Sequence, residues 1–461
     1  MERSATRMAP EATSSKVPLA PRLRRAIGSS RGPVARSEAL RAAVRVFLWS
    51  RIAILLVAVY AGLMVGSDGI PARNADRFDT PALTHPLGGL GDALLSPLAR
   101  WDAVWYLSIA DAGYGQADSP RTAFFPLYPL LVRGVGQLGG GSPGALLVAA
   151  YLVALACLLA ALVLLFRLAA LELGARAATA TLLLLSTFPA SLFFGAPYSE
   201  SLFLLCSVGA FYAARTGRWA WAGLAAAAAS GTRSAGVRLL VPLAIRYLYG
   251  PRGDRSQQRS ETDRGWLESL RPVHRVRADA TWLLLAPAGL VAYAAYLGLA
   301  HGDPLAFSSV QEFWSREFAG PLGGAWDGAV AAWAGARQLL SGSREVVYFD
   351  IAAGDPFRVA AHNLTLFGFL VFGAVATVGV LRRLPFAYGA YVTCALMLPL
   401  SFPVEPQPLM SLPRFLVVLF PIFMWLALVC EQRRMTARGA AASGVVLGLF
   451  VTQFAGWYWV A

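Results

Sequence analysis

Apolar segments long enough to cross a membrane recur along this chain and constrain its fold more than any other feature. The first, 44–65, matches the roughly 20 apolar residues that span a hydrocarbon core. Further candidate segments follow it at 144–166, 177–196, 199–215, 219–233, 236–249, 280–300, 363–381, 387–402, 413–430 and 440–460. We therefore expect an all-α polytopic membrane protein with about eleven transmembrane helices.

The charge composition supports this class and excludes others. Hydrophobic residues make up 57% of the chain and charged residues only 14%, whereas a soluble domain carries about 25% charged residues. In a polar chain the net charge of +14 would suggest a nucleic-acid binder, but here it fits arginine-rich cytoplasmic loops. We expect membrane lipids around the protein and no nucleic-acid partner.

The distribution of charge predicts domains and topology. The arginine-rich segment 1–42 is expected to be a disordered cytoplasmic tail, and 43–461 one transmembrane domain. Two segments with many acidic residues, 66–143 and 301–362, are expected to be large extracytoplasmic loops. The basic segment 250–278 is expected to be a cytoplasmic loop.

The short apolar stretch 124–138 decides whether this topology is consistent. It contains two prolines and an arginine. The basic loops fall on the cytoplasmic side and the acidic loops on the opposite side only if this stretch does not cross the membrane. The N-terminus is then cytoplasmic. Arginine supplies all but one of the basic residues, which is typical of a high-GC genome, so we expect a bacterial plasma membrane, or the endoplasmic reticulum if the cell is eukaryotic.

Cysteine and histidine suggest no metal centre. The four cysteines are scattered through the apolar segments, which predicts neither disulfides nor metal ligands. The four histidines show no ligand spacing. We expect no cofactor, and the alternative is a divalent ion held by Asp102 and other outer carboxylates.

The first candidate for chemistry is Asp102, in the sequence RWDAVWYLSIADAGYG at 100–115. Helical spacing would place Asp102, Trp105 and Tyr106 on one face, and aromatic rings suit the membrane–water interface. A carboxylate at this depth can take a proton from a hydroxyl group. The alternative is an aspartate that only stabilises a helix N-terminus through the helix dipole.

Three other charged residues lie in or beside apolar segments. Glu200 lies near the start of a returning helix, where it either serves the site or caps the helix. Arg233, in the sequence SGTRSAG, carries a charge that is costly in a membrane and suits a phosphate; the alternative is a turn with a snorkelling arginine. Arg414 follows Pro413 at a helix start, where a cation is unfavourable unless an anion is bound, and an interfacial anchor is the alternative.

Four motifs in order resemble a known family. RWDAVWYLSIADAGYG, TAFFPLYPLL, FPASLFFGAPYSESLFLL and SGTRSAG are similar to motifs of the phosphatidylinositol-glycan mannosyltransferase II (PIG-V) family, within the GT-C superfamily of membrane glycosyltransferases. The resemblance implies a GT-C-like fold. It also implies that the donor is a polyprenyl- or dolichyl-phosphate sugar and that the sugar is mannose. It also implies transfer with inversion to a hydroxyl of a glycolipid, glycan or protein acceptor on the extracytoplasmic side.

The resemblance also assigns residues. Asp102 matches the family's general base, and Glu200 and Arg233 match its YSES and TRS patterns. On this mechanism Arg233 with Arg414 would stabilise the leaving phosphate, and Trp101, Trp105 and Tyr106 would stack on the sugar or the lipid. The competing classes are a polytopic lipid or sugar transporter or flippase, and a membrane scaffold in which Asp102 is dispensable.

Overall fold

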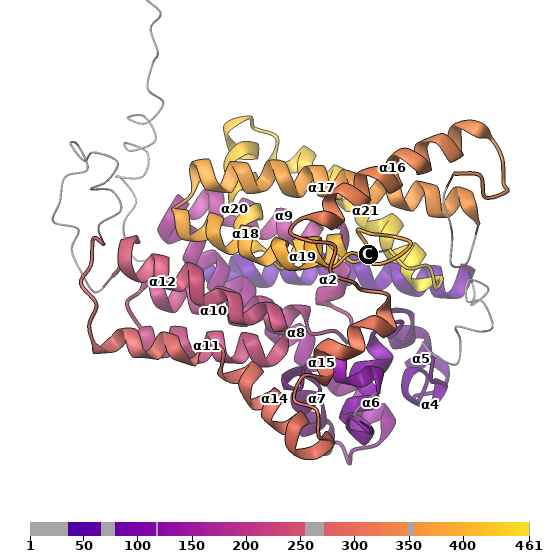
Figure 1. The fold of residues 1–461 in the computed structure, drawn as a ribbon, viewed down its shortest axis with the longest axis horizontal. Coiled ribbons are helices and arrows are strands. Elements are labelled where there is room, and N and C mark those ends of the chain that lie inside the picture. Colours follow the sequence, from indigo (N-terminus) through magenta and orange to yellow (C-terminus); the bar gives the residue numbers. More distant parts are fainter. Residues whose placement is uncertain (1–35, 66–78, 117–118, 254–271, 349–354, 461) are drawn as a thin grey trace, which may run out of the picture. The chain divides into compact units, whose positions relative to one another are not determined.

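The structure is a computed structural model that describes residues 36–65, 79–116, 119–253, 272–348 and 355–460. Within these residues every regular element is a helix (Figure 1). Four helices are long and apolar enough to cross a membrane: α2 (Arg36–Val65), α8 (Pro143–Leu173), α17 (Pro356–Arg383) and α21 (Thr436–Ala455). The chain is therefore an all-α membrane protein.

A bent pair of helices adds a fifth candidate span. The 3-10 helix η6 (Ala278–Leu285) and α14 (Ala288–His301) meet at a bend of 43°. Together they are long and apolar enough to cross a membrane. The other predicted spans form helices of 10 to 16 residues: α9 (Ala175–Thr187), α10 (Glu200–Arg215), α11 (Trp219–Thr232), α12 (Leu240–Tyr249), α18 (Phe386–Ser401) and α20 (Phe420–Gln432). The count of eleven spans is not confirmed and stays a prediction.

Proline and glycine explain why these helices are short. After α9, Pro189 begins the 3-10 helix η3 (Pro189–Phe194), because its ring has no amide hydrogen to continue the helix. After α11, the 3-10 helix η4 (Ser234–Leu239) contains Gly236. A Cβ atom at Gly236 would lie 2.2 Å from the carbonyl carbon of Ala229, so the chain can fold back here only with glycine.

The predicted tail boundary is wrong for residues 36–42, because helix α2 already begins at Arg36. Ala39 and Ala43 are one turn apart and both fully buried, so packing of this face extends the helix beyond the apolar segment. The remainder of the predicted tail and the middle of the predicted cytoplasmic loop 250–278 lie outside the described residues.

The two predicted outer loops contain short helices. The first holds α4 (Pro81–Thr84), α5 (Gly89–Leu95), η1 (Ser96–Leu98), α6 (Ala103–Ala112), η2 (Pro120–Ala123) and α7 (Leu127–Gln137). The second holds α15 (Ala306–Ser309), η7 (Val310–Trp314) and α16 (Gly323–Ser341). The 11 residues of α7 rise about 16 Å, which is half of a hydrocarbon core of about 30 Å.

Helix α10 places Glu200, one of the charged residues singled out from the sequence, in the core. It packs against α8 and α11 (Figure 1), and its first residue is Glu200. Two hydrogen bonds join the turn before it to the start of α6: the Tyr198 hydroxyl donates to the Arg100 carbonyl at 2.8 Å, and the hydroxyls of Ser199 and Tyr106 are 2.8 Å apart. These bonds bring the two motifs together.

Candidate functional site

The four charged residues singled out from the sequence form one network. Arg414 Nη1 donates to Asp102 Oδ2 at 2.5 Å, and Arg414 Nε donates to Glu200 Oε1. Arg233 Nη2 donates to the same Glu200 oxygen at 2.9 Å. Asp102 and Arg414 are 312 residues apart in the chain. The fold thus collects two carboxylates and two guanidinium groups from separate segments.

Both carboxylates pair with Arg414. Asp102 precedes α6, and its side chain forms no capping hydrogen bond with that helix. Glu200 is the first residue of α10. Both side chains form ion pairs with Arg414, so each has a charged partner in addition to any interaction with the start of its helix.

Strained backbone precedes both ends of the network. Trp101, directly before Asp102, has φ +57°, and Ser411, at the start of α19 (Leu412–Val417), has φ +71°. Left-handed conformations of non-glycine residues cost about 1–3 kcal/mol and gather at functional sites. Here the two strained residues lie within three positions of Asp102 and Arg414.

The side chains of the network differ in how far they are buried. The Glu200 side chain is fully buried and that of Arg414 is 6% exposed, whereas those of Asp102 and Arg233 are 18% and 15% exposed. Charges taken out of water need partners, and the two arginines balance the two carboxylates. Glu200 therefore has a supporting position behind the two arginines.

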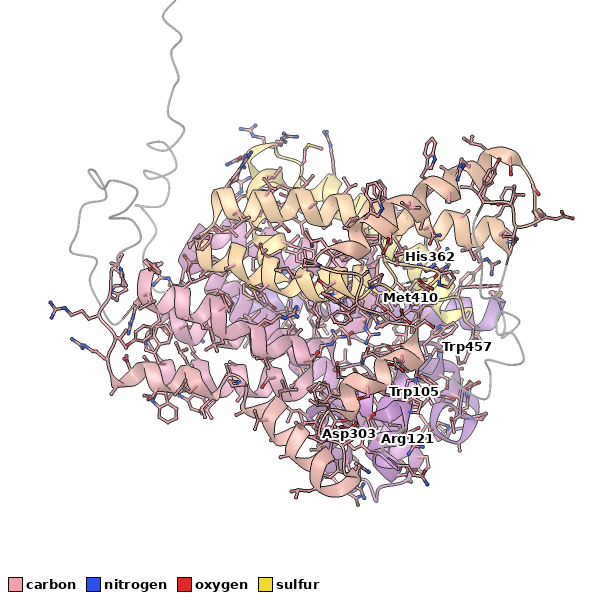
Figure 2. The ribbon with its side chains drawn as sticks, in the orientation of Figure 1. Trp105, Arg121, Asp303, His362, Met410 and Trp457 are labelled. Carbon is pink, nitrogen blue, oxygen red and sulfur yellow. The ribbon has the colours of Figure 1, made fainter. Side chains whose placement is uncertain are left out.

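A cavity of about 920 Å³ opens beside this network. Asp102, Arg233 and Arg414 line it, whereas Glu200 does not. Most of its lining is apolar and comes from several elements: Phe203, Ala395, Leu398, Phe402, Val418 and Met410, which is labelled in Figure 2. A cavity that combines charged and apolar side chains suits an amphiphilic ligand.

The three predicted aromatic residues take different positions. Trp101 and Tyr106 line the cavity, and Trp105 is not among its lining residues. Trp105 instead packs edge-on against Trp314, with 5.8 Å between the ring centroids. Trp101 packs edge-on against Trp457, labelled in Figure 2, at 5.9 Å.

Two arginines of the cavity lining were not assigned from the sequence. Arg238 lies on η4, and Arg316 follows η7 in the second outer loop. Burial and the positive charges of Arg414 and Arg233, opposed by Asp102, lower the pKa of Arg316 to about 10, so it stays charged at neutral pH. Arg316 carries no motif signal, because an arginine in a polar loop is ordinary.

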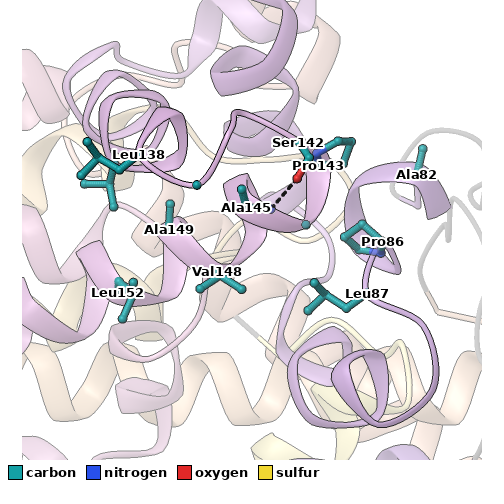
Figure 3. A pocket seen from close by; sticks show the side chains of 13 residues that line it. Ala82, Pro86, Leu87, Leu138, Ser142, Pro143, Ala145, Val148, Ala149 and Leu152 are labelled. Atoms are coloured by element: carbon teal, nitrogen blue, oxygen red, sulfur yellow. Dashed lines mark hydrogen bonds between the residues drawn. The ribbon is translucent and has the colours of Figure 1, made fainter.

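Metal ligands do not gather in the part of the chain that the structure describes: no group of three or more histidine, cysteine, aspartate or glutamate residues could hold an ion. Another cavity, of about 830 Å³, lies where α7 meets the start of α8 (Figure 3). Its lining contains alanine, proline, leucine, valine and glycine, with Ser142 as the polar member, which caps α8 by accepting from the Ala145 amide. This cavity has no charged side chain for chemistry.

The fold and the site define a class: an all-α membrane protein with a buried ionic network beside a partly apolar cavity. Residues 40–247 match the family model described as Mannosyltransferase (PIG-V). This match confirms the resemblance seen in the motifs, and it contains Asp102, Glu200 and Arg233 but ends before Arg316 and Arg414.

Curated relatives agree with this match. GPI alpha-1,6-mannosyltransferase 2 of Rattus norvegicus is 38% identical over 179 residues, which are 36% of this chain and 36% of the relative. The Mus musculus protein of that name is 37% identical over 178 residues, with the same two shares. GPI mannosyltransferase 2 of Drosophila melanogaster is 33% identical over 94 residues, 20% of this chain and 19% of the relative. The chain thus matches little more than a third of the length of the rodent relatives. No solved structure matches the chain.

Proposed function

We propose that this chain is an integral membrane mannosyltransferase. It takes a sugar from a polyprenyl- or dolichyl-phosphate donor and transfers it, with inversion, to an acceptor hydroxyl on the extracytoplasmic side. The observation that carries this proposal is the cavity in which Asp102, Arg233 and Arg414 meet an apolar wall. A lipid-linked donor needs such an apolar wall for its chain and cations for its phosphate.

Asp102 is the general base of this reaction. Its Oδ2 atom is held by Arg414, whereas Oδ1 accepts no hydrogen bond within the described residues and is available to the acceptor hydroxyl. Asp102 takes the hydroxyl proton while the acceptor oxygen attacks the anomeric carbon. The bond between that carbon and the phosphate oxygen breaks on the opposite face, so the configuration inverts and the lipid phosphate leaves with the bonding electron pair.

The arginines and Glu200 support this step. Arg233 contacts the phosphate and stabilises its growing charge, and Arg414 fixes the base while adding positive charge to the site. Glu200 is a positioning residue, because it holds both arginines from behind the cavity. Trp101 and Tyr106 face the cavity and stack on the sugar or the lipid, and Trp105 supports them through Trp314.

The acceptor and the membrane complete the proposal. The names of the relatives point to a glycolipid acceptor. A glycan and a protein are the other classes of acceptor. The first outer loop and the second outer loop face away from the cytosol, and the N-terminus is cytoplasmic. The membrane is a bacterial plasma membrane, or the endoplasmic reticulum in a eukaryotic cell, and the site needs no cofactor.

The test uses Asp102→Asn in the full-length protein, purified into lipid nanodiscs. Polyprenyl-phosphate mannose with a radiolabelled sugar is the donor, and a glycolipid extract supplies acceptors. The matched control is Asp111→Asn, an exposed aspartate of the same helix α6. Loss of a general base lowers transfer by about 10²–10⁴-fold, and the control keeps wild-type transfer.

Two outcomes would overturn the proposal. Full transfer by Asp102→Asn would remove the assigned base. Movement of the labelled lipid across the bilayer without a new glycosidic bond would make the chain a transporter.

A further inference from the structure

Arg316 differs from the arginines that the motifs single out. Four arginines line the cavity, and two of them, Arg233 and Arg414, form ion pairs with carboxylates. Arg316 Nη1 donates to the Phe402 carbonyl at 3.4 Å, a weak contact with a neutral acceptor. Glu312 and Glu317 also line the cavity, but they are exposed, and neither forms an ion pair with Arg316. Within the described residues Arg316 therefore forms no ion pair with a carboxylate.

Arg316 and Arg233 approach the same aromatic ring. The Arg233 Cζ atom is 5.8 Å from the centroid of the Phe415 ring, and the Arg316 Cζ atom is 5.9 Å from it. The two guanidinium groups can be no farther apart than these two distances combined. Like charges in a partly dry cavity repel each other, and an anion between them would turn that repulsion into attraction.

The backbone holds Arg316 in this position before any ligand arrives. Its amide donates to the Gln311 carbonyl at 3.2 Å, and its neighbour Ser315 has φ +53° and accepts from the Glu405 amide at 3.2 Å. An isolated β-bridge also pairs Arg316 with Val404. A cation fixed in this way needs little reorganisation to bind an anion.

We infer that Arg316 is a binding residue for the anionic phosphate of the lipid donor, acting with Arg233 around the Phe415 ring. This inference rests on the proposed function, because that function supplies the lipid phosphate. Two planar guanidinium groups can each bind two phosphate oxygens. Arg414 pairs with both Asp102 and Glu200 and holds the base, whereas Arg233 and Arg316 are the two lining arginines that share the Phe415 ring, and we assign the phosphate to them.

The experiment measures binding and does not depend on sugar transfer. The full-length protein in nanodiscs is titrated with a polyprenyl monophosphate that carries no sugar. The corresponding polyprenol, which lacks the phosphate, and inorganic phosphate are titrated separately. The variants are Arg316→Gln and Arg316→Lys. The matched control is Arg344→Gln, on the same outer loop, whose exposed side chain pairs with Asp355 away from the cavity lining.

The expected result is a loss of polyprenyl phosphate binding of about tenfold to a hundredfold in Arg316→Gln, as for one charge-assisted contact. Arg316→Lys recovers part of the loss because it keeps the charge, and Arg344→Gln binds as the wild type does. The polyprenol binds equally to all variants, and inorganic phosphate binds weakly and follows the same order. A correctly folded Arg316→Lys also shows that the position tolerates substitution.

Wild-type binding of polyprenyl phosphate in Arg316→Gln would overturn this inference and leave the proposed function intact. Equal losses for polyprenol and polyprenyl phosphate would also overturn it, because they would assign Arg316 to the lipid chain. No binding to the wild-type protein would overturn the inference together with the proposed donor. Normal binding without sugar transfer would count against the proposed function alone.

Discussion

Replacing Glu200 with glutamine removes a charge from the driest part of the network while preserving the shape of the side chain. Glu200 Oε1 accepts from both Arg233 and Arg414. The amide oxygen of glutamine can still accept both bonds, but each loses the attraction between opposite charges, about 1 kcal/mol. Asp102 is then the one carboxylate left in the network for two guanidinium groups, and breaking a buried pair in this way costs about 3–5 kcal/mol in total.

A second buried cluster provides the matched control. Glu172, at the end of α8, accepts from Arg215 and Arg246. Arg215 is the last residue of α10 and Glu200 is the first, so the two residues lie about 22 Å apart along that helix. Glu172→Gln should destabilise the protein by a similar amount without changing the cavity.

The assay combines unfolding with transfer activity. The free energy of unfolding and the rate of sugar transfer per folded molecule are measured for both variants in the same lipid. Glu200→Gln should lose both stability and transfer, whereas Glu172→Gln should lose stability and keep transfer. The double variant Glu200→Gln/Arg233→Gln should lose less stability than the sum of the two single changes, by about 0.5–3 kcal/mol, because it removes the unpaired cation. Glu200→Gln with wild-type stability and transfer would refute this reasoning.

Two further predictions concern packing and metals. Gly289→Ala should lower the free energy of unfolding by about 1–3 kcal/mol, because a Cβ atom there would lie 2.2 Å from the Gly231 amide nitrogen where α14 crosses α11; Gly368→Ala in α17, with no atom within 4 Å of its Cβ position, is the control. An unfolding curve of Gly289→Ala that matches wild type would contradict the close packing. Chelation with EDTA should leave transfer unchanged, since the described residues gather no metal ligands. A loss of transfer that added Mg²⁺ or Mn²⁺ restores would show that the site uses a metal.

Two members of the ionic network were predictable from the sequence because charge is expensive in an apolar segment. Glu200 and Arg233 stand among apolar residues, where each must find a partner or face a polar cavity. The partners themselves were not predictable. Which carboxylate Arg414 contacts depends on how segments 312 residues apart pack, and no local pattern carries that information.

The helix class was predictable to a similar degree. Hydropathy identifies the apolar segments, and the structure confirms helices for them, but their length depends on proline, glycine and tertiary packing. Pro189 interrupts the predicted span 177–196, and Gly236 lies at the start of the predicted span 236–249; each residue is part of a tight 3-10 turn after a helix. Hydropathy averaged over a window does not detect a single residue that ends a helix. The number of membrane crossings therefore cannot be established from composition.

On the proposed mechanism the arginines of the site have separate roles. A guanidinium that fixes the base loses part of its ability to bind a ligand, because its donors are already used by Asp102 and Glu200. If Arg414 alone served both purposes, an arriving phosphate would compete with Asp102 for it and would misplace the base at the moment of reaction. On our inference Arg316 removes this conflict, since it lines the cavity and its guanidinium donates to the Phe402 carbonyl and not to a carboxylate within the described residues. A site with this arrangement can bind the lipid phosphate while its base stays in place.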